Sequence, residues 1–164
     1  LGSVHDTPAG VIEVVEEPRR VGQNYRLVVR FQRTGTVVDC QQNNLSQGKV
    51  KDFNVRTVYS VGYIGSSLKI PQRGVGTIRR AYDLWANMLK RAYGEYDPSY
   101  ADVEVDPRWH SFTNFLNTLP LVPGYDDWER GVELHFDKDK RVPGSRLYSL
   151  DTCWFITPEQ NLSR

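Results

Sequence analysis

The chain has 164 residues, of which 39% are hydrophobic and 12% aromatic, so it can bury the core of one large or two small domains. Its formal net charge of +1 excludes a general polybasic coat, so any DNA contact must be local. No apolar run reaches the length of a membrane span, and Cys40 and Cys153 lack the spacing of a cysteine-based zinc site. Cys153 lies in an apolar run and indicates a buried thiol, so we expect a reducing cytoplasm.

The first half of the chain is dominated by short strand patterns. Residues 1–3, Leu-Gly-Ser, resemble the remnant of an expression tag. Residues 4–53 contain strand patterns at 11–15, 25–31 and 36–40 joined by tight turns. Several short strands within about fifty residues favour a small SH3-like β barrel. Its role stays open between a structural module and a nucleic-acid reader.

A glycine- and serine-rich stretch, residues 54–76, is predicted to be a linker with a short strand. The clearest helix follows at residues 77–92. Its apolar stripe recurs at three- and four-residue spacing through Ile78, Tyr82, Trp85 and Met88.

Positive charge is concentrated around that helix. Residues 69–91 carry six basic side chains and one acidic side chain, a local charge of +5. Such a cluster is what a phosphate-backbone contact requires. The predicted DNA-binding residues are Lys69, Arg73, Arg79, Arg80, Lys90 and Arg91. The alternative is a solvated helix face in which Arg79 pairs with Asp83 at i,i+4.

The segment after the helix offers few chemical groups. Asp106 and Pro107 predict a helix start, Trp109 and Phe115 predict core, and His110 is predicted to be a surface residue. An acidic loop at residues 126–129 would repel phosphate and is compatible with a protein contact.

The end of the chain predicts the order strand, long loop, strand, helix. Residues 132–136 alternate apolar and polar side chains, and residues 153–156 form a second apolar run. Thr157 has the pattern of an N-cap, with Pro158 at the first helical position and Gln160 three residues beyond the cap. This is the layout of a ββα finger.

Residues 82–91 read Tyr-x-x-Trp-x-x-Met-Leu-x-Arg, and they are followed by Trp109, His135 and Asn161 at compatible spacing. With these features, residues 58–161 resemble the HNH homing-endonuclease-like proteins of bacteriophages, in particular the subgroup with an Apetala-type DNA-binding domain. In such proteins a V-R-F-x-x-T-G segment and a G-x-V-x-D segment often come first. Here they correspond to residues 29–35 and 48–52.

The resemblance implies a metal-dependent nuclease site at this finger. Carried over by position, His135 is the general base, Ser145 stands where an Asn orients that base, and Asn161 or a neighbour is the helix ligand. Leu134 occupies a ligand position and offers no donor atom. The carboxylates of Asp137 and Asp139 could hold Mg²⁺ or Mn²⁺ instead, or they could be solvated turn residues.

We therefore expect an α+β protein: an SH3-like β barrel at residues 4–53, a linker at 54–76, and an HNH-like α+β domain at 77–164 that ends in the ββα finger. Two functions stay open. The first is binding of double-stranded DNA, with cleavage retained, weak or lost. The second is a non-enzymatic phage protein that binds a host protein, such as a defence or transcription factor.

Overall fold

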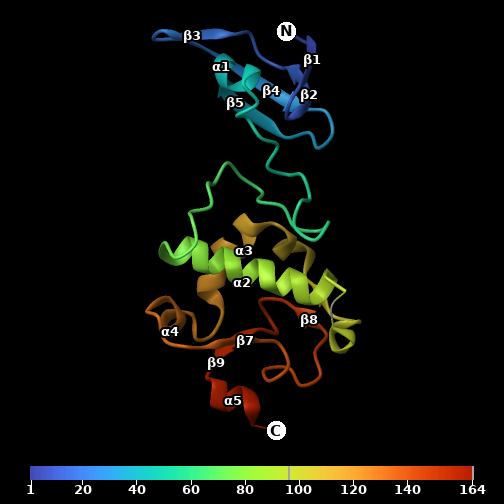
Figure 1. The fold of residues 1–164 in the computed structure, drawn as a ribbon, viewed down its shortest axis with the longest axis vertical. Coiled ribbons are helices and arrows are strands. Elements are labelled where there is room, and N and C mark those ends of the chain that lie inside the picture. Colours follow the sequence, from blue (N-terminus) through green and yellow to red (C-terminus); the bar gives the residue numbers. More distant parts are fainter. Residues whose placement is uncertain (96, 164) are drawn as a thin grey trace. The chain divides into compact units, whose positions relative to one another are not determined.

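The computed structural model describes residues 1–95 and 97–163 and confirms a mixed α+β protein (Figure 1). The chain divides into two compact units, Leu1–Val55 and Arg56–Arg164. Their hydrophobic cores have no residue in common.

The first unit is built on one five-stranded antiparallel sheet. Its strands are β1 (Val4–Thr7), β2 (Gly10–Val14), β3 (Arg19–Val21), β4 (Asn24–Phe31) and β5 (Val37–Gln41). Strand β4 is central: one edge pairs with β2 and β3 in succession, and the other edge pairs with β5. Strand β1 adds to β2.

Alternation along these strands places apolar side chains on one face of the sheet, under the short helix α1 (Gln42–Ser46). That core contains Ile12, Val14, Leu27, Val29, Phe31, Cys40, Leu45 and Val50. Among the described residues, the pairings end at β1 and β5, so the expected closed barrel is not observed. The physical reason lies in the chain after β5, which forms a helix and turns instead of a closing strand.

A partly buried polar network joins residues 34–36 to residues 52–54, at the ends of the two sequence segments V-R-F-x-x-T-G and G-x-V-x-D. The Asp52 carboxylate accepts hydrogen bonds from the Thr34 hydroxyl at 2.7 Å and the Thr36 hydroxyl at 2.8 Å. Thr36 is 4% exposed and also accepts from the Asn54 amide at 2.8 Å. The Thr of V-R-F-x-x-T-G and the Asp of G-x-V-x-D therefore hold the end of the unit together.

Residues 56–76 pack against the second core through partly buried apolar side chains, including Val58, Ile64 and Leu68. The segment expected to be a linker is therefore largely a part of the second unit. Gly62 allows this packing, because a Cβ there would lie 2.5 Å from Leu89 and 2.8 Å from Trp85.

The second unit is organised on helix α2 (Gly76–Tyr93), close to the predicted span. Of its predicted stripe, Trp85 and Met88 are at most 1% exposed, while Ile78 and Tyr82 are partly buried. Helix α3 (Phe112–Thr118) packs along α2, and Trp85 donates its indole N–H to the Trp109 carbonyl at 2.7 Å.

Short elements connect these helices to the end of the chain. They are η1 (Pro98–Tyr100), β6 (Glu104–Val105), η2 (Pro107–His110), η3 (Leu119–Leu121) and α4 (Tyr125–Glu129). Asp106 caps η2 by accepting from the Arg108 N–H, as the Asp-Pro pair predicted. Trp109 and Phe115 are buried and meet edge to face, which confirms them as core residues.

The last elements are β7 (His135–Asp137), β8 (Leu147–Tyr148), β9 (Trp154–Ile156) and α5 (Pro158–Leu162). Strands β7 and β9 pair antiparallel, while β8 pairs parallel with β6. Strand β7 begins later than the alternation predicted, because the Val132 N–H donates to the Asp127 carbonyl of α4. Thr157 and Gln160 form the predicted reciprocal capping box of α5.

Candidate functional site

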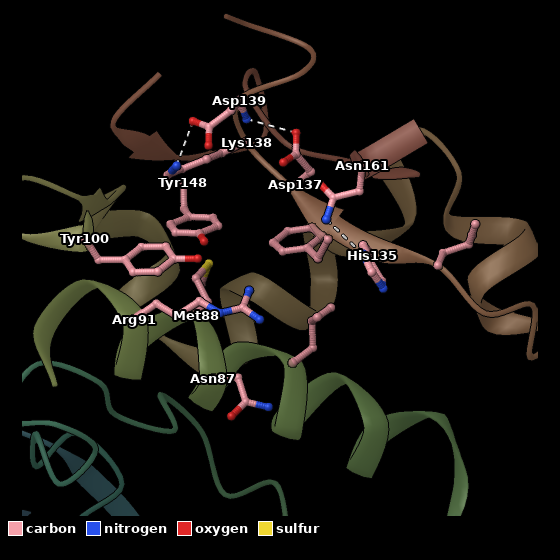
Figure 2. A pocket seen from close by; sticks show the side chains of 13 residues that line it. Asn87, Met88, Arg91, Tyr100, His135, Asp137, Lys138, Asp139, Tyr148 and Asn161 are labelled. Atoms are coloured by element: carbon pink, nitrogen blue, oxygen red, sulfur yellow. Dashed lines mark hydrogen bonds and ion pairs between the residues drawn. The ribbon is translucent and has the colours of Figure 1, made fainter. Parts of the chain in front are cut away.

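A pocket of about 460 Å³ lies between α2 and the strand-loop-strand-helix segment at the end of the chain (Figure 2). Its lining includes four of the predicted site residues, His135, Asp137, Asp139 and Asn161, and one of the predicted DNA-binding residues, Arg91. The remaining lining residues are Leu84, Asn87, Met88, Tyr100, Leu134, Phe136, Lys138 and Tyr148.

His135 and Asn161 contact each other on one side of this pocket. The Asn161 side-chain amide nitrogen lies 3.0 Å from the Nδ1 atom of His135 (Figure 2). His135 is the first residue of β7, and Asn161 is placed by α5, whose start is fixed by the capping box. An amide nitrogen only donates, so this contact suits the neutral tautomer in which Nδ1 accepts and Nε2 is the N–H group.

The two aspartates after His135 are already engaged. Asp137 Oδ2 accepts the backbone N–H groups of Asp139 at 2.9 Å and Lys140 at 2.7 Å. Asp139 Oδ1 accepts from the Lys138 ammonium at 2.7 Å. The Asp137 carboxylate thus stabilises the turn that follows β7, which is the turn role that the sequence left open.

Lys138 is a site residue that the sequence analysis missed. It is 4% exposed, and its ammonium lies 5.4 Å from the Tyr148 ring centroid and 6.0 Å from that of Tyr100. The sequence could have predicted this burial. Phe136 faces the core, and because side chains of a strand alternate between its two faces, residue 138 is expected to face the core as well. The charged neighbours of Lys138 hid this signal, because such a run usually indicates solvated side chains.

Tyr148 lies deep in the same pocket at 3% exposure. Burial raises the pKa of its hydroxyl to about 12, and the positive charge of the nearby Arg91 guanidinium offsets part of this rise. Tyr148 therefore keeps its proton throughout the physiological range.

The donor atoms do not fit the metal site of an HNH nuclease. The parts of the chain that the structure describes bring together no group of three or more His, Cys, Asp or Glu side chains able to hold a metal ion. Leu134 lines the pocket without a donor, and the amide of Asn161 is directed at His135. The Ser145 hydroxyl forms hydrogen bonds with the Leu147 backbone in its own turn. The side chain that contacts His135 is Asn161.

Two of the predicted DNA-binding residues make structural contacts. Arg79 forms the predicted pair with Asp83 at 2.9 Å and donates to the Pro71 carbonyl at 3.3 Å. Arg80 donates to the carbonyls of Trp128 at 2.6 Å and Glu129 at 3.2 Å, and its guanidinium covers the Trp128 ring. Arg80 therefore satisfies the last carbonyls of α4.

The other basic residues of this cluster lie near or within the second unit's surface hollows. A broad groove of about 920 Å³ along α2 is lined by Arg73, Lys90 and part of Arg79. Lys69 is exposed on the segment that precedes α2. Arg91 points into the His135 pocket instead, and Asn87 lines both hollows.

His110 is not the surface residue that the sequence predicted. It is partly buried, and its Nε2 lies 3.0 Å from the Val105 carbonyl and 3.5 Å from the Tyr93 hydroxyl. Burial lowers the pKa of its imidazole below the usual value, and the bond to Val105 opposes this shift. The helical spacing placed His110 away from the stripe of Trp109, but η2 is a 3-10 turn with a different period.

Comparisons with known proteins give no relative: no family model, no curated protein and no solved structure matches the chain. Among the described residues, no helix is long and apolar enough to cross a membrane.

Proposed function

We propose that the protein binds double-stranded DNA through its second unit and does not cleave it in a metal-dependent reaction. The observation that carries this proposal is the His135–Asn161 contact at the head of a strand-loop-strand-helix unit, facing helix α2. This arrangement supports an HNH-type ββα finger, as the resemblance implied. The open sheet of the first unit is proposed to be a divergent member of the small β modules that precede such fingers.

The chemistry of the finger favours binding over hydrolysis. A nuclease metal requires fixed oxygen or nitrogen ligands, and Leu134 supplies none, while the Asp137 and Asp139 carboxylates already accept hydrogen bonds. With the Asn161 amide donating to Nδ1, His135 presents a protonated Nε2, which is a hydrogen-bond donor and not a general base. Such a donor can bind a phosphate oxygen.

The groove along α2 offers the second contact to a phosphate backbone. Arg73 and Lys90 line it, and Lys69 lies on the adjoining segment. Cations on one face give affinity that does not depend on base sequence and that falls with salt. Arg79 and Arg80 are excluded from the proposed DNA-binding set, because carbonyl groups and Asp83 already engage them.

A gel-shift experiment on several unrelated duplexes, with and without Mg²⁺ or Mn²⁺, tests both parts of the proposal. We expect retarded DNA of unchanged length under all conditions, with similar affinity for each duplex. Metal-stimulated cleavage that His135→Ala abolishes would refute the binding-only function. Absence of retardation at low salt would refute DNA binding itself.

A second candidate is contact with a host protein, and a different surface favours it. A hollow of about 500 Å³ beside α4 includes Leu121, which is 68% exposed, and the acidic Asp126 and Asp127. An apolar side chain next to carboxylates suits a basic, amphipathic partner segment. If this function is correct, a basic amphipathic peptide binds the protein, and Leu121→Ser together with Asp126→Asn weakens that complex without changing DNA retention.

A further inference from the structure

Several side chains that line the His135 pocket carry hydrogen-bond donors. Figure 2 shows the Tyr100 and Tyr148 hydroxyls and the Arg91 guanidinium gathered at one side of the pocket, with His135 and Asn161 on the other side. Arginine can only donate hydrogen bonds, and the protonated Tyr148 hydroxyl beside it carries a donor hydrogen as well (Figure 2). The Nε2–H of His135 is a further donor.

Two cations, Arg91 and Lys138, and two carboxylates, Asp137 and Asp139, line the pocket, so its formal charges balance. The Asp139 carboxylate pairs with Lys138, and the Asp137 carboxylate accepts two backbone N–H groups. Among the residues that the structure describes, the ion pairs include none between Arg91 and a carboxylate. A guanidinium outside these ion pairs can bind an anion with several acceptor oxygens.

The burial of Tyr148 restricts which anion can reach all three donors, since Arg91 and His135 are exposed but Tyr148 is not. Tyr148 and Met88 are 3% and 1% exposed, so the Arg91 side of the pocket has a buried floor. The phosphodiesters of an intact duplex run along the outside of a wide cylinder, so they can reach the exposed His135 and Arg91 but not the buried hydroxyl of Tyr148. A single nucleotide at a strand end can reach that hydroxyl, and the rings of Tyr100 and Phe136 offer apolar walls to its sugar or base.

We propose that this pocket binds a phosphomonoester: the terminal phosphate of a DNA strand or of a free nucleotide. Arg91 and the Tyr148 hydroxyl donate to the phosphate oxygens, and His135, held by Asn161, donates from the opposite side. This inference rests on the proposed function of the same site, but it adds a ligand group that contact with the duplex backbone does not require.

The test compares two short duplexes of one sequence, one with 5′-phosphates and one with 5′-hydroxyls, in binding titrations with the full chain at constant ionic strength. We expect the 5′-phosphate to strengthen binding about tenfold, the effect of one charge-assisted contact. A nucleoside monophosphate should displace the phosphorylated duplex at concentrations at which the nucleoside has no effect.

Variants show whether the pocket is responsible. Arg91→Met and Tyr148→Phe keep the packing of the side chains and should bring the two affinities to within about twofold of each other. Asn161→Asp should do the same, because it places a carboxylate that repels the phosphate next to His135. Arg33→Met, the same substitution at an exposed residue of the first unit, should keep the tenfold preference. Thermal melting confirms that each variant is folded.

The outcomes separate this inference from the proposed function. Equal affinity of the wild-type protein for both duplexes overturns the phosphomonoester pocket and leaves DNA binding in place. Binding of the nucleoside monophosphate without any binding of duplex supports the pocket and overturns the proposed function. A preference that survives in Arg91→Met, Tyr148→Phe and Asn161→Asp alike also overturns the pocket, because the phosphate is then recognised elsewhere.

Discussion

Arg80 was predicted to bind DNA because it is basic, but in the structure it stabilises the end of α4. Its guanidinium donates to the Trp128 and Glu129 carbonyls at the end of α4 and lies 4.4 Å from the Trp128 ring centroid. Arg80→Ala removes two hydrogen bonds from a charged donor, and we expect it to lower the free energy of unfolding by about 2 kcal/mol. Urea unfolding measures this. Lys69→Ala, at an exposed position, should change stability by less than about 0.5 kcal/mol. Equal effects of the two substitutions would contradict the structural role of Arg80.

His110 makes stability depend on pH. Burial holds the pKa of its folded imidazole below the usual value, with Arg56 lowering it further and Asp106 and the Val105 carbonyl raising it. As the pH falls, the unfolded chain binds a proton at His110 before the folded chain does, so protonation favours unfolding. Stability is therefore lost as the pH falls through the ordinary histidine range, and the loss ends once the folded imidazole is also protonated.

Urea unfolding at about pH 7.5 and about pH 5.5 tests this, with His110→Gln as the comparison. The wild-type protein should lose more stability between the two conditions than the variant does. Equal losses would show that other groups cause the pH dependence.

At the scale of elements, α5 is a helix of five residues that depends on its cap. The Thr157 hydroxyl accepts from the Gln160 N–H at 3.1 Å, and the Gln160 side chain accepts from the Thr157 N–H at 2.9 Å. Isolated helices of this length are unstable, so the cap and the contact with β7 determine where Asn161 lies.

Thr157→Ala should therefore destabilise α5 by about 1 kcal/mol and speed hydrogen exchange of the Asn161 amide, which donates to the Thr157 carbonyl at 3.0 Å. Thr157→Ser keeps the capping hydroxyl and should restore protection. Unchanged exchange in the alanine variant would mean that α5 is held by contacts other than its cap.

Sequence patterns predicted those elements whose stabilising interactions are local. The apolar period of α2 gave its ends to within a residue, and the capping pattern at Thr157 was confirmed in detail. Interactions between distant residues were not predictable. The partners of Arg80 are backbone carbonyls nearly fifty residues away, the pairing of β1 and β5 decides whether the sheet closes, and Lys138 is buried by Tyr100 and Tyr148. The periodicity and spacing of residues in the sequence do not show which distant residues come into contact.

In the candidate site, too, some features could be predicted from the sequence and others could not. The strand-loop-strand-helix order predicted that His135 and Asn161 belong to one unit, and they do contact each other. Whether Asp137 binds a metal or stabilises a turn depended on backbone N–H groups whose direction is set only in the folded chain. The same holds for Arg91, which leaves the basic face of α2 and enters the pocket.

At the scale of the whole molecule, the two separate cores predict two unfolding transitions. All four tryptophans, Trp85, Trp109, Trp128 and Trp154, lie in the second unit, so tryptophan fluorescence reports that unit alone. Far-ultraviolet circular dichroism reports both units. The first unit has 55 residues and a small core, and a domain of that size is marginally stable. We expect part of the circular dichroism change to precede the fluorescence change in urea. Coincident curves would show that the units unfold together.

The salt dependence of duplex binding tests the central claim most directly, because it counts the phosphates that the second unit contacts. The logarithm of the association constant should fall linearly with the logarithm of the salt concentration, and Lys69→Gln with Arg73→Gln should reduce the slope by about 0.9 for each lost phosphate contact. This reduction should be the same for unrelated sequences, since phosphate contacts carry no sequence information. A slope that the double substitution leaves unchanged would contradict DNA binding by the basic face of this unit.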